Sequence, residues 1–144
     1  MRNLIRNDSG AATIELAISY MLGFTMLLGI LEFCMMAYTF AAAAEATRDG
    51  LHYAVIHGSS STSCSGPTTG CDPSATAVTA DVTTFLAKFS SQATSPTVTV
   101  TYSDASSSPS SLINITTTYT YRPLFGLPGF TRTFHTTAGG RILY

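Results

Sequence analysis

The chain has 144 residues, of which 45% are hydrophobic and 10% are charged, and its formal net charge is −1. Seven basic residues against eight acidic ones offer no basic surface that could follow a phosphate backbone, so nucleic acid is excluded as an expected partner. This length leaves room for one membrane span and one small soluble domain with a thin core.

Residues Met1–Gly10 are predicted to form a short cytoplasmic leader. Arg2 and Arg6 precede the first apolar run with only Asp8 against them, whereas the charges that follow this run nearly cancel. Because an excess of basic residues marks the cytoplasmic side of a span, the N-terminus is expected in the cytoplasm and the C-terminal domain in the periplasm or outside the cell. The frayed cytoplasmic tail of an unprocessed single-span protein would have the same composition.

A single transmembrane helix is predicted over residues 11–44. Between Ile14 and Ala44, Glu15 and Glu32 are the only acidic residues, and the stretch holds no lysine or arginine. A bilayer core about 30 Å thick needs about twenty apolar residues at about 1.5 Å per residue, and this segment exceeds that length.

A removable secretory signal is the alternative interpretation of the same segment. Such signals have an apolar region of roughly 7–15 residues followed by small residues at the cleavage site. The run Ala41–Ala44 could act as such a site, but the apolar region before it is about twice too long.

The two glutamates require different explanations. Glu15 lies at the cytoplasmic edge, where it can reach the water of the headgroup layer. Glu32 lies deep in the predicted span or near its far third, and a carboxylate at the bilayer centre costs at least about 2.5 kcal/mol. Either Glu32 is protonated and bonded to a carbonyl of its own helix, or it contacts a partner span. Thr25, Glu32 and Thr39 are spaced seven residues apart, which places a narrow polar stripe on one face of the helix.

The start of the span carries the most specific pattern in the sequence. A short basic leader ends at Gly10, the small Ala11 follows, and the acidic Glu15 stands fifth after the glycine. This pattern resembles the processing site of type IV pilin-like proteins, in which a membrane aspartyl peptidase cuts after the glycine. By that resemblance Ala11 would become the new N-terminus, and Glu15 would pair with the N-terminal amine of a neighbouring subunit and set the register of assembly.

Two further blocks, Gly29–Phe33 and Glu45–Ala54, resemble the TadE family of tight-adherence pseudopilins. The chain departs from the family pattern at Cys34, Met35 and Asp49, among others. The resemblance implies a minor pseudopilin that is not an enzyme, processed after Gly10 by a prepilin peptidase, in the bacterial inner membrane and in the pilus.

The expected partners are then the membrane, the peptidase and other pilins or pseudopilins, with Glu32 contacting a second pseudopilin span. The protein is expected in only a few copies per pilus, because a full extracytoplasmic domain would crowd a thin filament if it were repeated at every position. The alternative function is an uncleaved, membrane-tethered binding or adhesion module, which fits everything except the leader pattern.

Beyond the membrane, helical periodicity is expected to continue to about His57, where Gly58 would end the helix. Cys64 and Cys71 then bracket a loop rich in glycine and proline. Outside the cytoplasm this spacing predicts a disulfide, because it fits neither a zinc site nor a redox motif. Free thiols or an intermolecular pair are the alternatives.

The domain, residues 45–144, is predicted to be α+β. Asp72 followed by proline indicates a helix start, and apolar residues at helical spacing predict an amphipathic helix over Pro73–Ser91. Alternating residues predict strands at 98–102, 113–121 and 131–138, with the glycine pair Gly139–Gly140 after the last of them. A three- to four-stranded antiparallel sheet should therefore carry this helix on one face, with the extended N-terminal helix against it.

Between the second and third strands, Tyr119–Leu124 matches a Tyr-x-Tyr-x-Pro-Leu passage of the resembled family. The apolar loop Leu124–Phe130 that follows is interpreted either as a flap that closes the core or as an exposed patch for a partner.

The sequence carries little catalytic chemistry. His52, His57 and His135 do not form a ligand pair, and the chain has no nucleophile motif and no phosphate-binding loop. No catalytic residue, cofactor, metal or small-molecule substrate is expected.

Overall fold

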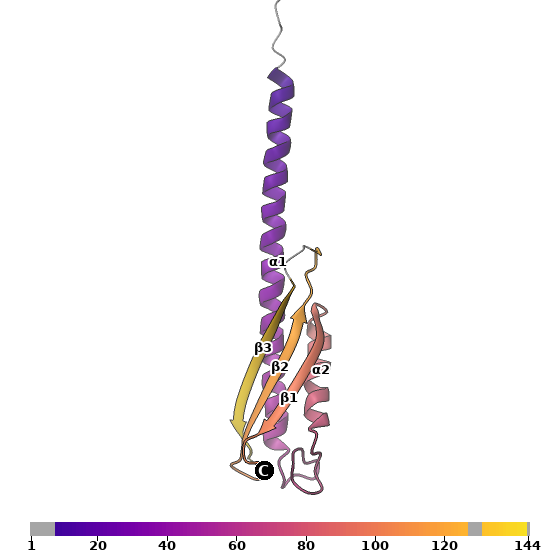
Figure 1. Ribbon diagram of the computed structural model, residues 1–144, viewed down its shortest axis with the longest axis vertical. Coiled ribbons are helices and arrows are strands. Elements are labelled where there is room, and N and C mark those ends of the chain that lie inside the picture. The colour runs from indigo at the N-terminus through magenta and orange to yellow at the C-terminus, as the bar shows by residue number, and fades with distance from the viewer. Residues whose placement is uncertain (1–7, 127–130, 144) are drawn as a thin grey trace, which may run out of the picture.

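The structure is a computed structural model, and it describes residues 8–126 and 131–143. It has the α+β class that the sequence predicts, with two helices followed by three strands (Figure 1). In chain order the elements are α1 (Asp8–Ile56), α2 (Thr76–Phe89), β1 (Ala93–Tyr102), β2 (Leu112–Tyr121) and β3 (Arg132–Arg141).

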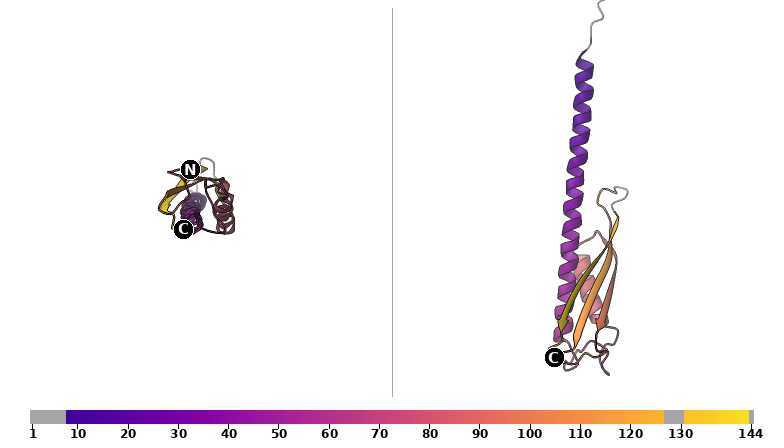
Figure 2. Two further views of the ribbon diagram at one scale, coloured as in Figure 1. Left: turned by 90° about the horizontal axis from the view of Figure 1, so that it is seen from below. Right: turned by 60° about the vertical axis from the view of Figure 1, so that its left-hand side comes forward.

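Helix α1 is one continuous helix of 49 residues. Its N-terminal half stands clear of the rest of the chain, whereas its C-terminal half runs along the whole length of the small domain (Figures 1 and 2). Burial by the domain begins at Glu32, well before residue 45, where the sequence places the start of the domain. The membrane-facing and domain-facing parts of the chain thus belong to a single rigid element.

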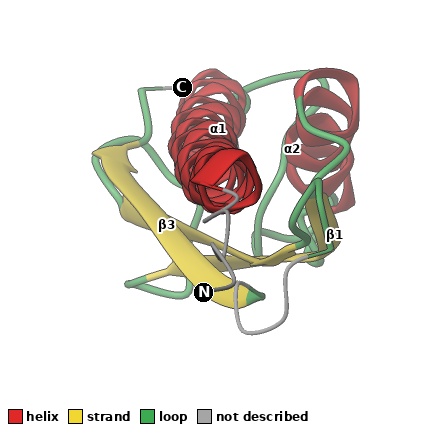
Figure 3. Ribbon diagram, turned by 90° about the horizontal axis from the view of Figure 1, so that it is seen from above, coloured by secondary structure: helices red, strands yellow, loops and turns green. Residues whose placement is uncertain are grey.

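The three strands form an antiparallel sheet in the order β1-β2-β3. Both helices lie on the same face of this sheet (Figure 3), and the strand residues alternate accordingly. In the central strand β2 the buried positions are Ile113, Ile115, Thr117, Tyr119 and Tyr121. The opposite face of the sheet is largely threonine, which suits a β-surface in contact with water.

Helix α2 begins at Thr76, and the prediction that it starts at Pro73 is wrong. The Asp72 carboxylate accepts hydrogen bonds from Ser74 N at 3.2 Å, Thr76 Oγ1 at 2.7 Å and Ala77 N at 3.2 Å. These bonds hold residues 73–75 in a turn outside the helix. They also lower the pKa of the Asp72 carboxyl, and the bond from the Thr76 side chain contributes most to this shift. Asp72 therefore accepts a hydrogen bond from Ala77 N at the start of α2 across the intervening turn, instead of standing directly before the first residue of the helix.

The third strand runs on to Arg141, so the prediction that it ends before the glycine pair is also wrong. Gly139 pairs with Asn114 and Gly140 with Ile113. A Cβ atom on Gly140 would lie 3.4 Å from side-chain atoms of α1, so the absence of a side chain lets the helix come close to the sheet. Both glycines are strand residues, and Gly140 is the one that lies against α1.

Small residues also line the face of α1 that packs against the domain. Ala43, Ala46 and Ala54 are buried, and Gly50 meets the side chain of Val82 in α2. Removal of residues up to Ala44 as a signal peptide would take Glu32, Thr39 and Ala43 out of the domain core, so an ordinary signal peptide is disfavoured by the packing.

The loop between the helices is closed by a disulfide between Cys64 and Cys71, as predicted. Backbone bonds reinforce it, since Asp72 N donates to Cys64 O at 3.2 Å and Gly66 N donates to Asp72 O at 2.8 Å. The bridge therefore fixes the segment that ends in the Asp72 turn and leads into α2.

Replacing Gly50 by alanine should destabilise the domain, because the new methyl group would overlap the Val82 side chain. The expected loss is about 1–3 kcal/mol of unfolding free energy, measured by thermal unfolding in detergent micelles. Gly139→Ala is the matched control, since its new Cβ would meet only ordinary contacts at 3.5 Å and beyond. Equal melting temperatures for the two variants would contradict the close α1–α2 contact.

Replacing both Cys64 and Cys71 by serine should lower stability by about 2.5 kcal/mol in the chain-entropy treatment of a loop this short. The melting temperature of the oxidised protein, compared with that of the double variant, measures the effect. Cys34→Ser serves as the control, because Cys34 is a free, exposed cysteine on α1 and its loss should change little. An unchanged melting temperature in the double variant would show that the bridge does not stabilise the domain.

Candidate functional site

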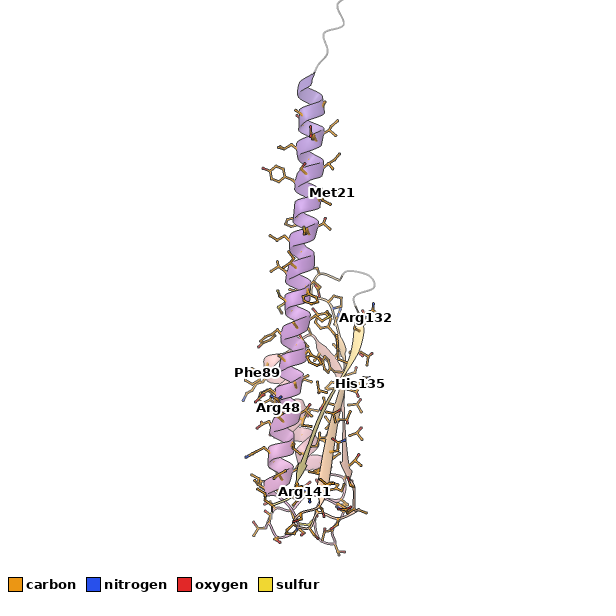
Figure 4. The ribbon with its side chains drawn as sticks, turned by 90° about the vertical axis from the view of Figure 1, so that its left-hand side faces the viewer. Met21, Arg48, Phe89, Arg132, His135 and Arg141 are labelled. Carbon is orange, nitrogen blue, oxygen red and sulfur yellow. A yellow bond between two sulfur atoms is a disulfide. The ribbon has the colours of Figure 1, made fainter. Side chains whose placement is uncertain are left out.

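The first part of the candidate site is the bare N-terminal half of α1. From Ile14 to Leu31 its large apolar side chains are mostly exposed, and Met21 is 74% exposed (Figure 4). Within the described residues, Gly10–Ile56 is the one helix long and apolar enough to cross a membrane, and no part of its most apolar window is buried by the protein. An apolar surface of this size requires a bilayer or other apolar helices around it.

Gly10, Ala11 and Glu15 lie at the start of this bare segment, and all three are exposed. A Cβ atom built on Gly10 meets nothing within 4 Å. Ala11 and Glu15 are four residues apart in a helix, so they share one face, one turn from each other. The roles in processing and assembly that the sequence suggests for these residues remain predictions.

The second part is a buried junction at Glu32, which is 1% exposed. Its Oε1 accepts hydrogen bonds from the Tyr121 hydroxyl at 2.5 Å and from Leu124 N at 3.1 Å, and its Oε2 accepts one from Phe125 N at 3.3 Å. Both oxygens of the side chain therefore have donors, as a buried polar group requires. The junction therefore ties the mid-point of α1 to the end of β2 and the loop after it.

The local sequence explains why these donors converge on one carboxylate. Tyr121 is the last residue of β2 and points to the helix-covered face, so its ring reaches α1. Arg122 and Pro123 then turn the chain, and the next two amides face back toward the helix. Burial, together with the bond to Glu32, raises the pKa of the Tyr121 phenol well above its ordinary value, so the phenol remains a donor.

The structure gives Glu32 hydrogen-bond partners that the sequence analysis does not name. Its donors come from its own domain, rather than from a carbonyl of its own helix among the described residues. The contact of Glu32 with a second span stays a prediction. The domain reaches Glu32, and the bare apolar segment ends just before it. Glu32 thus lies at the far end of the bare segment, which fits a position near the far third of the predicted span better than one deep in its middle.

Two threonines of α1 beyond Glu32, Thr39 and Thr47, face the domain as well. Thr39 accepts a hydrogen bond at 3.3 Å from the Ser90 hydroxyl, which follows α2. Thr47 lies 2.9 Å from Thr117 Oγ1 and 2.8 Å from Thr136 Oγ1, and so connects α1 to both β2 and β3. Thr25, in the bare half, bonds only to Met21 O of its own helix among the bonds described, at 2.8 Å. The stripe from Glu32 onward is therefore an internal seam.

The apolar loop predicted over Leu124–Phe130 is described only as far as Gly126; residues 127–130 lie outside the described residues. Leu124 and Phe125 keep their side chains exposed while their amides bind Glu32. In its described part the loop is therefore not a flap over the core, and its side chains are available to surroundings outside the protein.

The three histidines lie apart. His57 stacks on Tyr53, His135 bonds to Thr118 on the outer face of the sheet at 2.9 Å, and His52 is exposed. Among the described residues no group of three or more histidine, cysteine or acidic side chains could hold a metal ion.

The long apolar helix α1 is a candidate membrane span, and in the described residues it continues as the spine of a small α+β domain. The family comparison agrees with this layout: residues 10–52 match the model of the TadE-like protein family. This stretch is thus a TadE-like segment, which confirms the predicted resemblance and supports a component associated with the Tad pilus. No curated protein and no solved structure matches the chain.

Replacing Tyr121 by phenylalanine should destabilise the domain by about 1.5–3 kcal/mol, because Glu32 loses its shortest hydrogen bond and stays buried. Tyr119→Phe is the matched control on the same strand. The Tyr119 hydroxyl is buried with no hydrogen-bond partner among the described residues, so its removal should leave stability equal or higher. Thermal unfolding of both variants in micelles gives the comparison; a larger loss for Tyr119→Phe would refute the junction.

Proposed function

We propose that the chain is a minor pseudopilin of the tight-adherence pilus, a non-enzymatic assembly component. It is anchored in the bacterial inner membrane with its N-terminus in the cytoplasm and its domain in the periplasm. The observation that carries the proposal is that the TadE-like segment, residues 10–52, coincides with α1, whose first half the domain leaves bare. Such a helix can be held by lipid before assembly and by the helices of other subunits afterwards.

Processing after Gly10 by a prepilin peptidase is the first step of this function. The exposed Gly10–Ala11 bond stands at the cytoplasmic edge of the apolar segment, where a membrane peptidase can reach it. Cleavage would make the Ala11 amine a new terminus, whose pKa of about 7.7–8.0 keeps it largely cationic at neutral pH. That amine and a Glu15 carboxylate of a neighbouring subunit then form an ion pair in apolar surroundings, which favours a single axial register.

The partners are other pilins or pseudopilins of the same system. Below the Glu32 junction the side of α1 that faces away from the domain remains apolar and exposed, with Phe33, Ala37, Tyr38 and Ala41 at helical spacing. This surface supports helix-to-helix contact that continues beyond the bilayer. The bulk of the domain beside the helix supports minor stoichiometry, because it would crowd a filament made of this subunit alone.

Replacing Gly10 by leucine should leave an uncut precursor, because the peptidase must fit a residue without a side chain at that position. Intact-mass measurement of the protein from membranes distinguishes a chain that begins at Met1 from one that begins at Ala11. Gly23→Leu is the matched control, since that position is equally open but lies inside the span. A native chain that itself begins at Met1 would favour the uncleaved, membrane-tethered binding or adhesion module.

Glu15→Ala should be processed and remain in the membrane, yet pili and surface attachment should be lost in cells that carry it. Glu45→Ala, another exposed acidic residue of α1, should assemble normally, because its ion pair with Arg48 lies on the surface. Normal pili in both the Glu15→Ala and the Gly10→Leu strains would contradict the pseudopilin function.

A further inference from the structure

Two arginines lie at the end of the domain where the bare half of α1 begins. Arg122 directly follows β2, and Arg132 opens β3 opposite Tyr121, the residue that binds Glu32. Both arginines are exposed, and Figure 4 shows Arg132 at this end and Arg141 at the opposite one. Glu32 is the acidic side chain described at this end, and it is buried and bonded to Tyr121, Leu124 and Phe125. Asp72 and Asp104 belong to loops at the distal end of the sheet.

Apolar side chains accompany the two arginines. Leu124 is 53% exposed and Phe125 is 43% exposed, although the amides of both are fixed by Glu32. On the free side of α1, Phe33 and Tyr38 are exposed close to the same level as Glu32. Aromatic and apolar side chains beside arginines are the composition of a surface that sits in the membrane–water interface.

The length of the helix places this end of the domain at that interface. At about 1.5 Å per residue, Ala11–Leu31 is about 30 Å long, which is the thickness of the hydrocarbon core. Because α1 is continuous through Glu32, the loop held by Glu32 must emerge at the level of the outer headgroups.

A cleft of about 310 Å³ opens at the same place. Arg122 lines it together with Ser91, Gln92, Pro123, Leu124 and Gly126. Arg122 N donates to Gln92 O at 2.8 Å, which joins the two walls of the cleft. A guanidinium group with hydroxyl and amide side chains beside it matches the oxygens of a phosphodiester.

We propose that the membrane-proximal end of the domain binds the headgroups of anionic phospholipids in the outer leaflet. Arg122 contacts a headgroup phosphate in the cleft, Arg132 contacts a second one at the edge of the sheet, and Leu124 and Phe125 enter the interface. Glu32 holds the loop in position for this contact. The inference requires the membrane span but not the pilus role, so the two can fail separately.

The position of the loop can be measured by tryptophan fluorescence, because the protein contains no tryptophan. Phe125→Trp keeps the amide that binds Glu32 and places the probe at the proposed contact; Leu143→Trp, exposed near the distal end, is the matched control. The full chain is reconstituted in nanodiscs that contain lipids with a spin-label quencher just below the headgroup. Emission from the Phe125→Trp variant should be quenched and blue-shifted, and emission from the Leu143→Trp variant should not. Equal emission from both variants would overturn the proposal.

The role of charge is tested by comparing nanodiscs of phosphatidylcholine alone with nanodiscs that also contain phosphatidylglycerol. Quenching of the probe at position 125 should increase with phosphatidylglycerol, and added salt should reduce the increase. Arg122→Gln should abolish the increase, whereas Arg141→Gln, at the far end of the domain, should retain it. If phosphatidylglycerol gives no increase, or if the two arginine variants behave alike, headgroup binding by Arg122 is refuted.

Discussion

A buried carboxylate needs donors, and the arrangement of this protein follows from where Glu32 finds them. The side chain sits on a helix surrounded by apolar residues, where it would be expensive without partners. Its own domain supplies a phenol and two backbone amides, so the domain must reach up the helix as far as residue 32. Within α1, the part N-terminal to that residue is left bare, and the part C-terminal to it becomes the spine of the domain.

Below this junction the packing of α1 depends on the absence of bulk. Alanines and Gly50 allow α2 to approach on one side, and Gly140 allows the sheet to approach on the other. Threonines fill the remaining polar positions and bond across the seam, as Thr47 does to Thr117 and Thr136. A helix with large side chains on this face would push both layers away. The same helix carries its large apolar side chains in the bare half, where the described part of the chain does not cover them.

Much of this could be predicted from local patterns. The apolar run, the helical stripe of α2, the alternating strands and the cysteine pair are properties of short segments, and the structure contains all four. The partner of Glu32 could not be predicted in the same way, because Tyr121 lies 89 residues away and the register of a distant strand decides the contact. One signal was available: a carboxylate in an apolar helix calls for donors, and the Tyr119–Leu124 passage contains a phenol followed by a proline turn. The start of α2 and the end of β3 differ from the predictions for related reasons, because the Asp72 turn and the close approach of α1 at Gly140 depend on tertiary contacts.

The continuity of α1 also determines how contacts made by the span affect the domain. With no linker between the two, a rotation or axial shift of the bare half is transmitted to the whole sheet. The Glu32 junction strengthens this coupling, because it fastens the membrane-proximal end of the sheet to the helix. The distal end of the sheet is fastened to the helix by other contacts. In the proposed pseudopilin, partner helices that select one register for the bare half would therefore also select one orientation for the arginine-bearing end and for the threonine face of the sheet. The angle of the domain would then be set through α1, even where the domain makes no contact with its neighbours.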